Sequence, residues 1–416
     1  MKFLHTADWH LGQTFYEYDR TAEHQAFLDW LKHTIEKEKI DVLLVAGDIF
    51  DTANPAASTV RLFYDFLNHI SSQQPELQTF IIAGNHDSAI RLETPTPLLA
   101  GTNIHLVGQV KKTDDHQIDY EKLIYPVQQN NEPVACCVAV PFLRLGDYPK
   151  SDKGGYDYLE GITRFYEEIL DEAKDIADGK PIIVMGHLHA SGTDFSVNDT
   201  AERAIMGGIE GLSINTLAEK ADYWALGHIH KPQAVDGNQH IRYSGSPVPL
   251  SFSEIDYPHQ VVIFEVNQNK VQNIDSLLIP VDVPLINIPK NGYKDLESVL
   301  EEIRQLPEKE LFDTKDYPYL QIRIAMNKPN PDIKPKIQQG IANKAVRLAK
   351  IDARMHISND KMTLKKQPEI IDLQNINPKE VLKKSFENKY NQPLPDYYET
   401  MLNTILADID QQKNQR

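Results

Sequence analysis

Five short loops hold the residues of this sequence whose types and spacing could do chemistry. They contain Asp8-Trp9-His10, Gly47-Asp48, Gly84-Asn85-His86-Asp87, Gly186-His187 and Gly227-His228-Ile229-His230. Their candidate metal ligands all offer oxygen or nitrogen: Asp8, His10, Asp48, Asn85, His187, His228 and His230. Such donors suit Mn²⁺, Mg²⁺, Fe²⁺ or Zn²⁺, and the lack of a nearby cysteine argues against a thiolate site.

Seven donors are too many for one ion and suit two, with Asp48 as the natural bridge. Two ions about 3.5–4 Å apart can activate a bridging hydroxide and neutralise the charge that builds on a phosphoryl group. The set therefore predicts phosphoester hydrolysis. A single histidine of this kind is usually structural, but five such loops in register favour a site. His187-Leu188-His189 looks like a second His-x-His pair, but the seven other residues already complete the ligand shells of two ions, which argues against His189 as a ligand. We expect His5, inside the first predicted strand, to lie in the core.

The elements that must position these loops follow an α/β pattern. Short apolar runs predict five strands: Phe3–His5, Asp41–Ala46, Thr79–Ala83, Pro133–Val140 and Pro181–Met185. Stretches of helical period separate them, with two apolar stripes, one of Phe27, Leu28, Leu31 and Ile35 and one of Val60, Phe63, Phe66, Leu67 and Ile70. Open sheets place their chemistry in the loops that follow such strands.

The 416 residues predict two or three domains at the usual ~100–200 residues each. A hairpin of Val261–Val266 and Val271–Leu278 closes the first, residues 1–278, and prolines follow it. Residues 279–366 predict a small α+β module with helices at Leu296–Leu306 and near Lys334–Asn343, a strand at Tyr319–Ala325 and an alternating run Val346–Ile357 that fits either a strand or a helix. Residues 367–416 predict two helices, Pro378–Lys389 and Asp396–Gln411.

Four stretches resemble a known family: FLHTADWHLG (Phe3–Gly12), GDIFDT (Gly47–Thr52), GHIHKPQ (Gly227–Gln233) and YSGSPVPLSF (Tyr243–Phe252). They are similar to those of the SbcD family, nuclease subunits of bacterial SbcCD complexes within the calcineurin-like metallophosphoesterases. The resemblance implies an α/β fold, a four-layer αββα metallophosphoesterase sandwich with a small α+β capping domain that faces DNA and a C-terminal helical hairpin that binds a partner.

The same resemblance assigns roles to single residues. It implies one ion held by Asp8, His10, Asp48 and His230 and a second held by Asp48, Asn85, His187 and His228. His86 is left unligated, where it can act as general acid toward the leaving 3′-oxygen. Asp87 either orients His86 or simply caps its loop, and Trp9 lies either near the nucleotide or in the core.

The implied activity is a two-metal hydrolysis of DNA phosphodiesters with Mn²⁺, or Mg²⁺ or another divalent ion in its place. It comprises 3′–5′ double-strand exonuclease and single-strand or hairpin endonuclease activity at DNA ends, in repair, recombination and replication. The implied partner is an SbcC-like SMC-type ATPase, in a heterotetramer of two plus two subunits, with a homodimer through the nuclease domain. A small-molecule phosphodiesterase, a phosphoprotein phosphatase and a non-enzymatic DNA tether remain alternatives.

The formal net charge of −17 at first argues against a polyanionic substrate. The charge is segregated, however, since residues 328–384 hold 13 basic and six acidic side chains. Candidate phosphate contacts there are Lys344, Arg347, Lys350 and Arg354, although a solvated face or an acidic partner explains the run equally well. Apolar residues at helical spacing predict the partner surface, namely Leu382, Phe386, Tyr390, Tyr397, Met401 and Ile405.

Two further features predict a cytoplasmic location. The longest apolar run, Pro133–Leu145, is shorter than the ~18 residues that a membrane span needs, and the amino terminus lacks a signal-peptide pattern. Cys136 and Cys137 are adjacent, so they cannot join distant segments, and we expect them to be buried thiols in a reducing compartment.

Overall fold

The computed structural model describes residues 1–151, 155, 157–194, 211–309 and 317–355. The chain divides into two compact units, Met1–Met355 and His356–Arg416, and all described residues belong to the first. The two predicted carboxy-terminal helices therefore lie outside the described residues, and so do the candidate partner-binding residues Leu382, Phe386, Tyr390, Tyr397, Met401 and Ile405.

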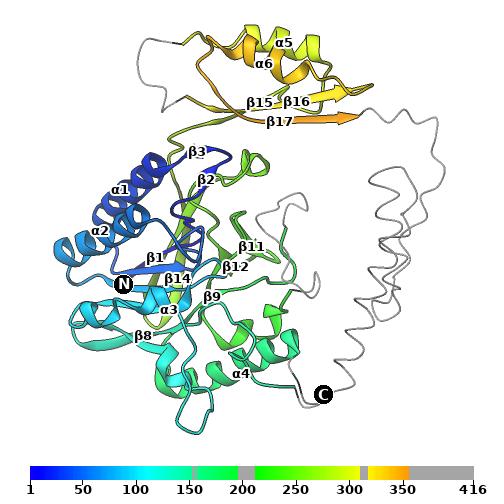
Figure 1. The fold of residues 1–416 in the computed structure, drawn as a ribbon. Helices are drawn as coiled ribbons and strands as arrows, with labels where there is room; N and C mark the ends of the chain where they lie inside the picture. The colour runs from blue at the N-terminus through cyan, green and yellow to red at the C-terminus, as the bar shows by residue number, and fades with distance from the viewer. Residues whose placement is uncertain (152–154, 156, 195–210, 310–316, 356–416) are drawn as a thin grey trace. The chain divides into compact units, whose positions relative to one another are not determined.

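The first sheet is six-stranded, with the order β14-β13-β1-β4-β5-β6 (Figure 1). Its strands are β1 (Lys2–Thr6), β4 (Val42–Ala46), β5 (Gln78–Ile82), β6 (Ile104–Val107), β13 (Gln260–Asn267) and β14 (Lys270–Leu278). The first four run parallel, while β13 joins β1 antiparallel and pairs with β14 in the predicted hairpin. Parallel neighbours place their carboxyl ends, and the loops that follow, at one edge.

The second six-stranded sheet has the order β11-β12-β10-β9-β8-β7. Its strands are β7 (Ile124–Gln129), β8 (Glu132–Ala139), β9 (Ile182–His187), β10 (Tyr223–Gly227), β11 (Gln233–Val235) and β12 (Asn238–Tyr243). The four central strands are parallel. Cys136 and Cys137 lie buried in β8 as free thiols, as predicted.

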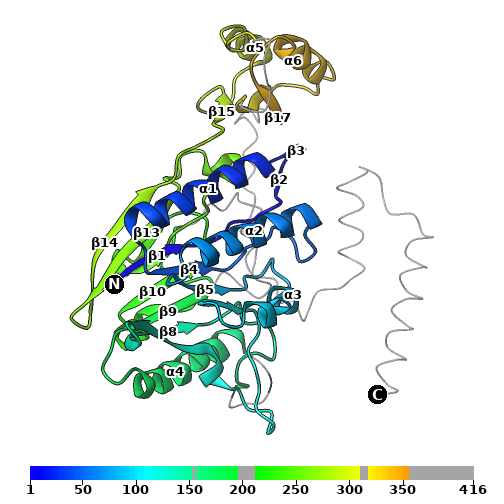
Figure 2. The ribbon, with the colours of Figure 1, turned by 90° about the vertical axis from the view of Figure 1, so that its left-hand side faces the viewer.

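The two sheets face each other between helical layers (Figure 2). Alternation along β4 shows why: Val42 and Leu44 enter the core between the sheets, whereas Leu43 and Val45 enter the core beneath α1 (Thr21–Glu38) and α2 (Ala57–Gln73). Both predicted stripes pack on that face, with only Val60 partly exposed. Helix α4 (Tyr158–Ala177) covers β8 and β9 of the second sheet. This confirms the four-layer αββα sandwich.

Shorter elements connect these layers. They are β2 (Thr14–Phe15), β3 (Tyr18–Asp19), α3 (Ala89–Glu93) and the 3₁₀ turns η1 (Thr96–Leu99), η2 (Tyr120–Leu123), η3 (Ile214–Thr216), η4 (Ala218–Lys220) and η5 (Phe252–Glu254). None of the helices in the described part of the chain is long and apolar enough to cross a membrane.

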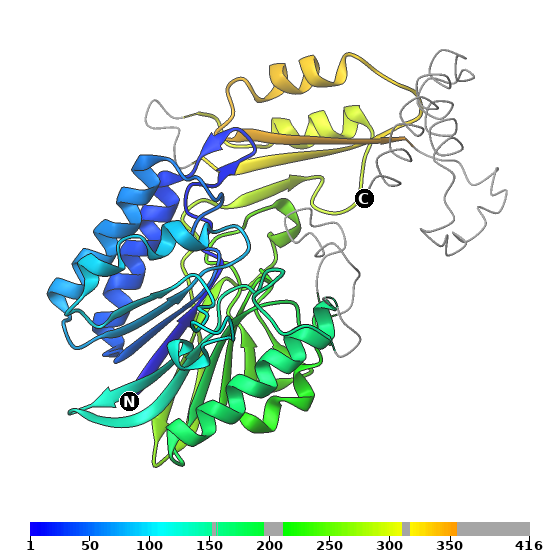
Figure 3. The same ribbon diagram turned by 60° about the horizontal axis from the view of Figure 1, so that its bottom comes forward.

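A smaller sheet with its own apolar core follows the sandwich (Figure 3). Its parallel strands are β15 (Leu285–Ile288), β16 (Tyr319–Met326) and β17 (Arg347–Met355), with helices α5 (Leu296–Arg304) and α6 (Ile333–Ile341). The run that fitted either a strand or a helix is thus a strand. Asp295 caps α5 by accepting a hydrogen bond from the Ser298 amide at 3.0 Å. The predicted domain boundaries at 278 and 366 remain predictions.

Candidate metal centre

Strand ends of both sheets bring the candidate ligands together in one buried cluster. Among the described residues, three groups place their donor atoms within 4.8 Å of one another: Asp8, His10 and His230; Asp8, Asp48 and His187; and His10, Asp48 and His86. Asp8, His10 and Asp48 follow β1 and β4, whereas His187 and His230 come from β9 and the loop after β10. Asp8, His10 and Asp48 each belong to two of these groups, so the groups form one continuous cluster.

The cluster contains buried polar atoms that suit a cation. Asp8 Oδ2 and His10 Nε2 are fully buried and have no hydrogen-bond partner among the described residues. Leaving such a buried atom without a hydrogen bond costs roughly 1–3 kcal/mol, which coordination to a metal would offset. With oxygen and imidazole donors around them, these residues fit a hard or borderline divalent ion.

Asn85 contacts two other predicted ligands of the second ion, His187 and His228. Its Oδ1 lies 3.0 Å from His187 Nε2 and 3.0 Å from His228 Nδ1. His187 Nδ1 donates to the Ala46 carbonyl at 2.9 Å, and because a carbonyl only accepts, the ring proton sits on Nδ1. His187 Nε2, which lies 3.3 Å from Asp48 Oδ2, is then the atom that can bind a metal.

Charge and burial perturb the pKa values in the cluster. Burial raises the pKa of the Asp8 carboxyl. Burial acts in the same direction on Asp48, but the imidazoles of His187 and His10 outweigh it and lower the pKa of that carboxyl. Burial opposes protonation of His187 too, yet the carboxylates of Asp48 and Asp8 raise its pKa to about 9. Burial lowers the pKa of His228 to about 3, so its imidazole is neutral and can act as a metal ligand.

The backbone is bent sharply at these loops. Asp8, His10, Asp48 and His228 adopt φ angles of 53°, 45°, 49° and 100°, a region that non-glycine residues rarely occupy. Glycines give the ligands room: a Cβ at Gly84 would lie 2.1 Å from Asp48 Oδ1, and one at Gly47 would lie 2.2 Å from His187 Nδ1. The glycines beside the ligands therefore allow close approach between loops.

His86 lies at the edge of the cluster, near His10 and Asp48. Its Nδ1 is 2.8 Å from the Asp51 carbonyl, which holds the ring. Asp87 accepts hydrogen bonds from the amides of Ile49, Phe50 and Gly84, so it caps the loop and does not orient His86.

Three other aromatic residues named by the sequence lie away from the ligand groups. Trp9 is fully buried against Phe27, Phe63 and Phe66, which makes it a core residue. His5 is also in the core, bonded to the Tyr223 hydroxyl and the Leu226 carbonyl, as expected. His189 belongs to none of the ligand groups found among the described residues.

Two carboxylates that sequence reasoning missed support ligand histidines. Glu254 Oε1 lies 3.1 Å from His230 Nδ1, and Asp51 Oδ1 lies 3.2 Å from His10 Nδ1. Burial alone would raise the pKa of Glu254, but the hydrogen bond from His230 lowers it. Asp51 follows the ligand loop directly in GDIFDT, a signal that could have found it. Nothing in the spacing of Glu254 links it to His230.

The basic residues of the small sheet divide into two pairs. Lys344 is buried, and its ammonium donates to the carbonyls of Arg304 and Leu306 and to Glu308. Arg347 donates to the Tyr317 carbonyl and stacks 3.8 Å from the centre of the Tyr319 ring. These contacts are structural, and they argue against Lys344 and Arg347 as phosphate ligands. Lys350 and Arg354, in contrast, are exposed.

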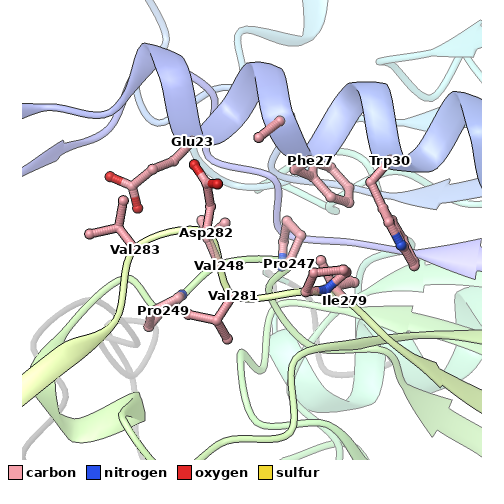
Figure 4. A pocket seen from close by; sticks show the side chains of 12 residues that line it. Glu23, Phe27, Trp30, Pro247, Val248, Pro249, Ile279, Val281, Asp282 and Val283 are labelled. Carbon is pink, nitrogen blue, oxygen red and sulfur yellow. The ribbon is translucent and has the colours of Figure 1, made fainter. Parts of the chain in front are cut away.

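A pocket of about 180 Å³ lies apart from the candidate ligands (Figure 4). Glu23, Phe27 and Trp30 of α1 line one wall, and the Pro247–Pro249 loop and residues 279–283 line the other. Glu23 and Asp282 lie toward one end and Trp30 toward the opposite end. No candidate ligand lines it, so the pocket is separate from the metal cluster.

Comparison with known proteins agrees with this geometry. Residues 1–232 match the family model described as Calcineurin-like phosphoesterase, and residues 281–390 match Type 5 capsule protein repressor C-terminal domain. The chain is 34% identical over 358 residues to the SbcD component of the nuclease SbcCD from Rhodobacter capsulatus, covering 84% of this chain and 86% of the relative. It is 33% identical over 346 residues to the Escherichia coli K12 protein of the same name, covering 81% of each, and 30% identical over 336 residues to that of Bacillus subtilis, covering 78% and 80%. The chain therefore belongs to the SbcD family of nuclease subunits within the calcineurin-like phosphoesterases.

Proposed function

We propose that this protein hydrolyses DNA phosphodiesters with two divalent ions bound at the strand-end cluster. Asp8, His10, Asp48 and His230 would hold one ion, and Asp48, Asn85, His187 and His228 the other. The observation that carries the proposal is the convergence of these side chains, with Asp8 Oδ2 and His10 Nε2 buried and without a hydrogen-bond partner among the described residues. The physiological metal proposed is Mn²⁺.

The bound ions would supply an activated hydroxide and neutralise charge at phosphorus. The protein's own contribution is orientation. The Ala46 carbonyl fixes the ring of His187, and the Asp51 carbonyl fixes that of His86 at 2.8 Å. Because a carbonyl accepts only, His86 carries a proton on Nδ1. Its Nε2 would pass a proton to the leaving 3′-oxygen from the imidazolium form, in which both ring nitrogens are protonated, and the ring would be left neutral.

The proposed setting is the complex that the relatives' name describes, with an SbcC-like SMC-type ATPase as partner. We propose a heterotetramer of two plus two subunits, with 3′–5′ exonuclease activity on duplex ends and endonuclease activity on single strands and hairpins. The partner would bind the segment of residues 367–416. The nuclease domains would form the homodimer contact, and the complex would act in the cytoplasm.

The test is cleavage of end-labelled duplex, hairpin and single-stranded DNA in Mn²⁺ by the full chain, with and without the ATPase partner. Nucleotide phosphodiesters and phosphopeptides serve as competing substrate classes. Cleavage of the small substrates with none of DNA in either arm would refute the proposal in favour of a small-molecule phosphodiesterase or a phosphatase. No hydrolysis of any substrate, with both ions bound, would indicate a tether.

His86→Ala tests the proton-transfer role. We expect turnover to fall by roughly 10²–10⁴-fold while two metal ions remain bound, because a general acid contributes about that much. His33→Ala, an exposed histidine of α1, is the matched control and should change neither quantity. Loss of one metal equivalent in His86→Ala, measured by elemental analysis, would make His86 a ligand instead.

A further inference from the structure

A buried carboxylate outside the ligand set contacts one of the proposed metal ligands. Glu254 is 0% exposed, and its Oε1 lies 3.1 Å from Nδ1 of His230, which is 2% exposed. Glu254 belongs to η5, 24 residues further along the chain. A carboxylate buried this deeply is retained only where its oxygens have hydrogen-bond donors.

Both oxygens of Glu254 do have donors. Oε2 accepts from the Leu250 amide at 2.8 Å and faces the Ser246 hydroxyl at 3.3 Å. The Ser246 amide in turn donates to the His230 carbonyl at 3.1 Å. The loop before η5 thus holds the backbone of His230, while Glu254 of η5 holds its ring.

The loop is itself anchored to the start of the chain. Arg20, buried and paired with Glu23, donates to the Pro249 carbonyl at 2.6 Å. Gln13 donates to the Leu250 carbonyl at 3.0 Å. Since these bonds fix Leu250, whose amide holds Oε2, and the residue before it, Glu254 has little freedom to move away from His230.

We infer that Glu254 is a positioning residue for the metal site, which holds His230 with its proton on Nδ1 and its Nε2 directed to the ion. An ionised carboxylate accepts but does not donate, so the Glu254 contact selects that tautomer. It also strengthens the imidazole as a ligand, and loss of such a partner typically weakens metal binding 10–100-fold. The inference rests on the proposed function, because it takes His230 as a ligand of the first ion.

Glu254→Gln tests it, since the amide keeps the size but loses the charge and presents one donor group. We expect isothermal titration of the full chain with Mn²⁺ to show one of two ions bound 10–100-fold more weakly and the other unchanged. Glu219→Gln, the same substitution at an exposed position, is the matched control and should bind both ions like the wild type. Equal Mn²⁺ affinities in Glu254→Gln and wild type would overturn the inference.

Thermal melting of both proteins with and without Mn²⁺ separates a positioning role from a role in folding. A positioning role predicts that Mn²⁺ raises the melting temperature of the variant less than that of the wild type at the same concentration. If Glu254→Gln does not fold, Glu254→Asp keeps the charge but withdraws it by one methylene, and unchanged Mn²⁺ affinity there would refute the role. If the wild type itself fails to bind two Mn²⁺ ions, the proposed function fails, which is a distinguishable result.

Discussion

Removing one hydroxyl should loosen the small sheet from the sandwich. Tyr319, the first residue of β16, is fully buried, and its hydroxyl donates to Glu23 Oε1 at 2.7 Å. Glu23 Oε2 already takes both bonds from Arg20. The Tyr319 ring packs with Phe15, at a centroid distance of 4.7 Å. Tyr319→Phe keeps the ring contacts and deletes only the bond to the carboxylate.

The size of the effect follows from the kind of bond. A hydrogen bond to a charged group contributes about 1.5–3 kcal/mol. The equilibrium between the native state and a state in which the small sheet has opened should therefore shift toward the open state by roughly 10- to 150-fold. Tyr18 offers a matched comparison, because its hydroxyl donates to the neutral Leu348 carbonyl at 3.1 Å. A neutral bond contributes about 0.5–1.5 kcal/mol, so Tyr18→Phe should shift the opening only about 2- to 12-fold.

Native-state hydrogen exchange followed by mass spectrometry measures this opening at the peptides that hold β15 and β16. We expect the exchange rate of these peptides to increase in the order wild type, Tyr18→Phe, Tyr319→Phe. The exchange rates of β8 and β9 should not change, because these strands lie in the second sheet of the sandwich. Tyr125→Phe, which removes an exposed bond to the Lys122 carbonyl, should match the wild type. Exchange in Tyr319→Phe equal to that of the wild type would refute the idea that the Glu23 contact holds this sheet.

Two further predictions concern substrate and metal binding. Lys350→Ala and Arg354→Ala should each weaken binding of a labelled duplex and lower the slope of log affinity against log salt by about one, as anisotropy titrations would show. Lys344→Ala should leave that slope unchanged and instead destabilise the small sheet by about 1–3 kcal/mol, because three partly buried hydrogen bonds lose their donor. Mn²⁺ affinity should rise as pH increases from 6 to 8. The reason is that His187, whose pKa is raised to about 9 in the metal-free cluster, must release a proton before it binds an ion. Calorimetry in two buffers of different ionisation enthalpy would detect that proton, and a pH-independent affinity would contradict it.

Much of the fold could be predicted because burial leaves a direct trace in the chain. Strands covered on both faces must be apolar throughout, and β4 shows this in Val42–Ala46. The helices α1 and α2 bury one face, so their stripes have a period of 3.6 residues. The run that became β17 is only half-buried, so its pattern fitted a helix equally well, and pairing with β16 decided the outcome.

The sequence by itself determined which side chains could bind a metal, because ligand chemistry depends on residue type and the ligands directly follow recognisable strands. Tertiary structure alone decided the support of those ligands. The partnership of Glu254 with His230, the left-handed backbone at Asp8 and Asp48, and the division of Lys344 from Lys350 all depend on which segments meet. Contacts between residues far apart in the chain leave no periodic trace, since each requires only one compatible side chain at a place that the rest of the fold defines.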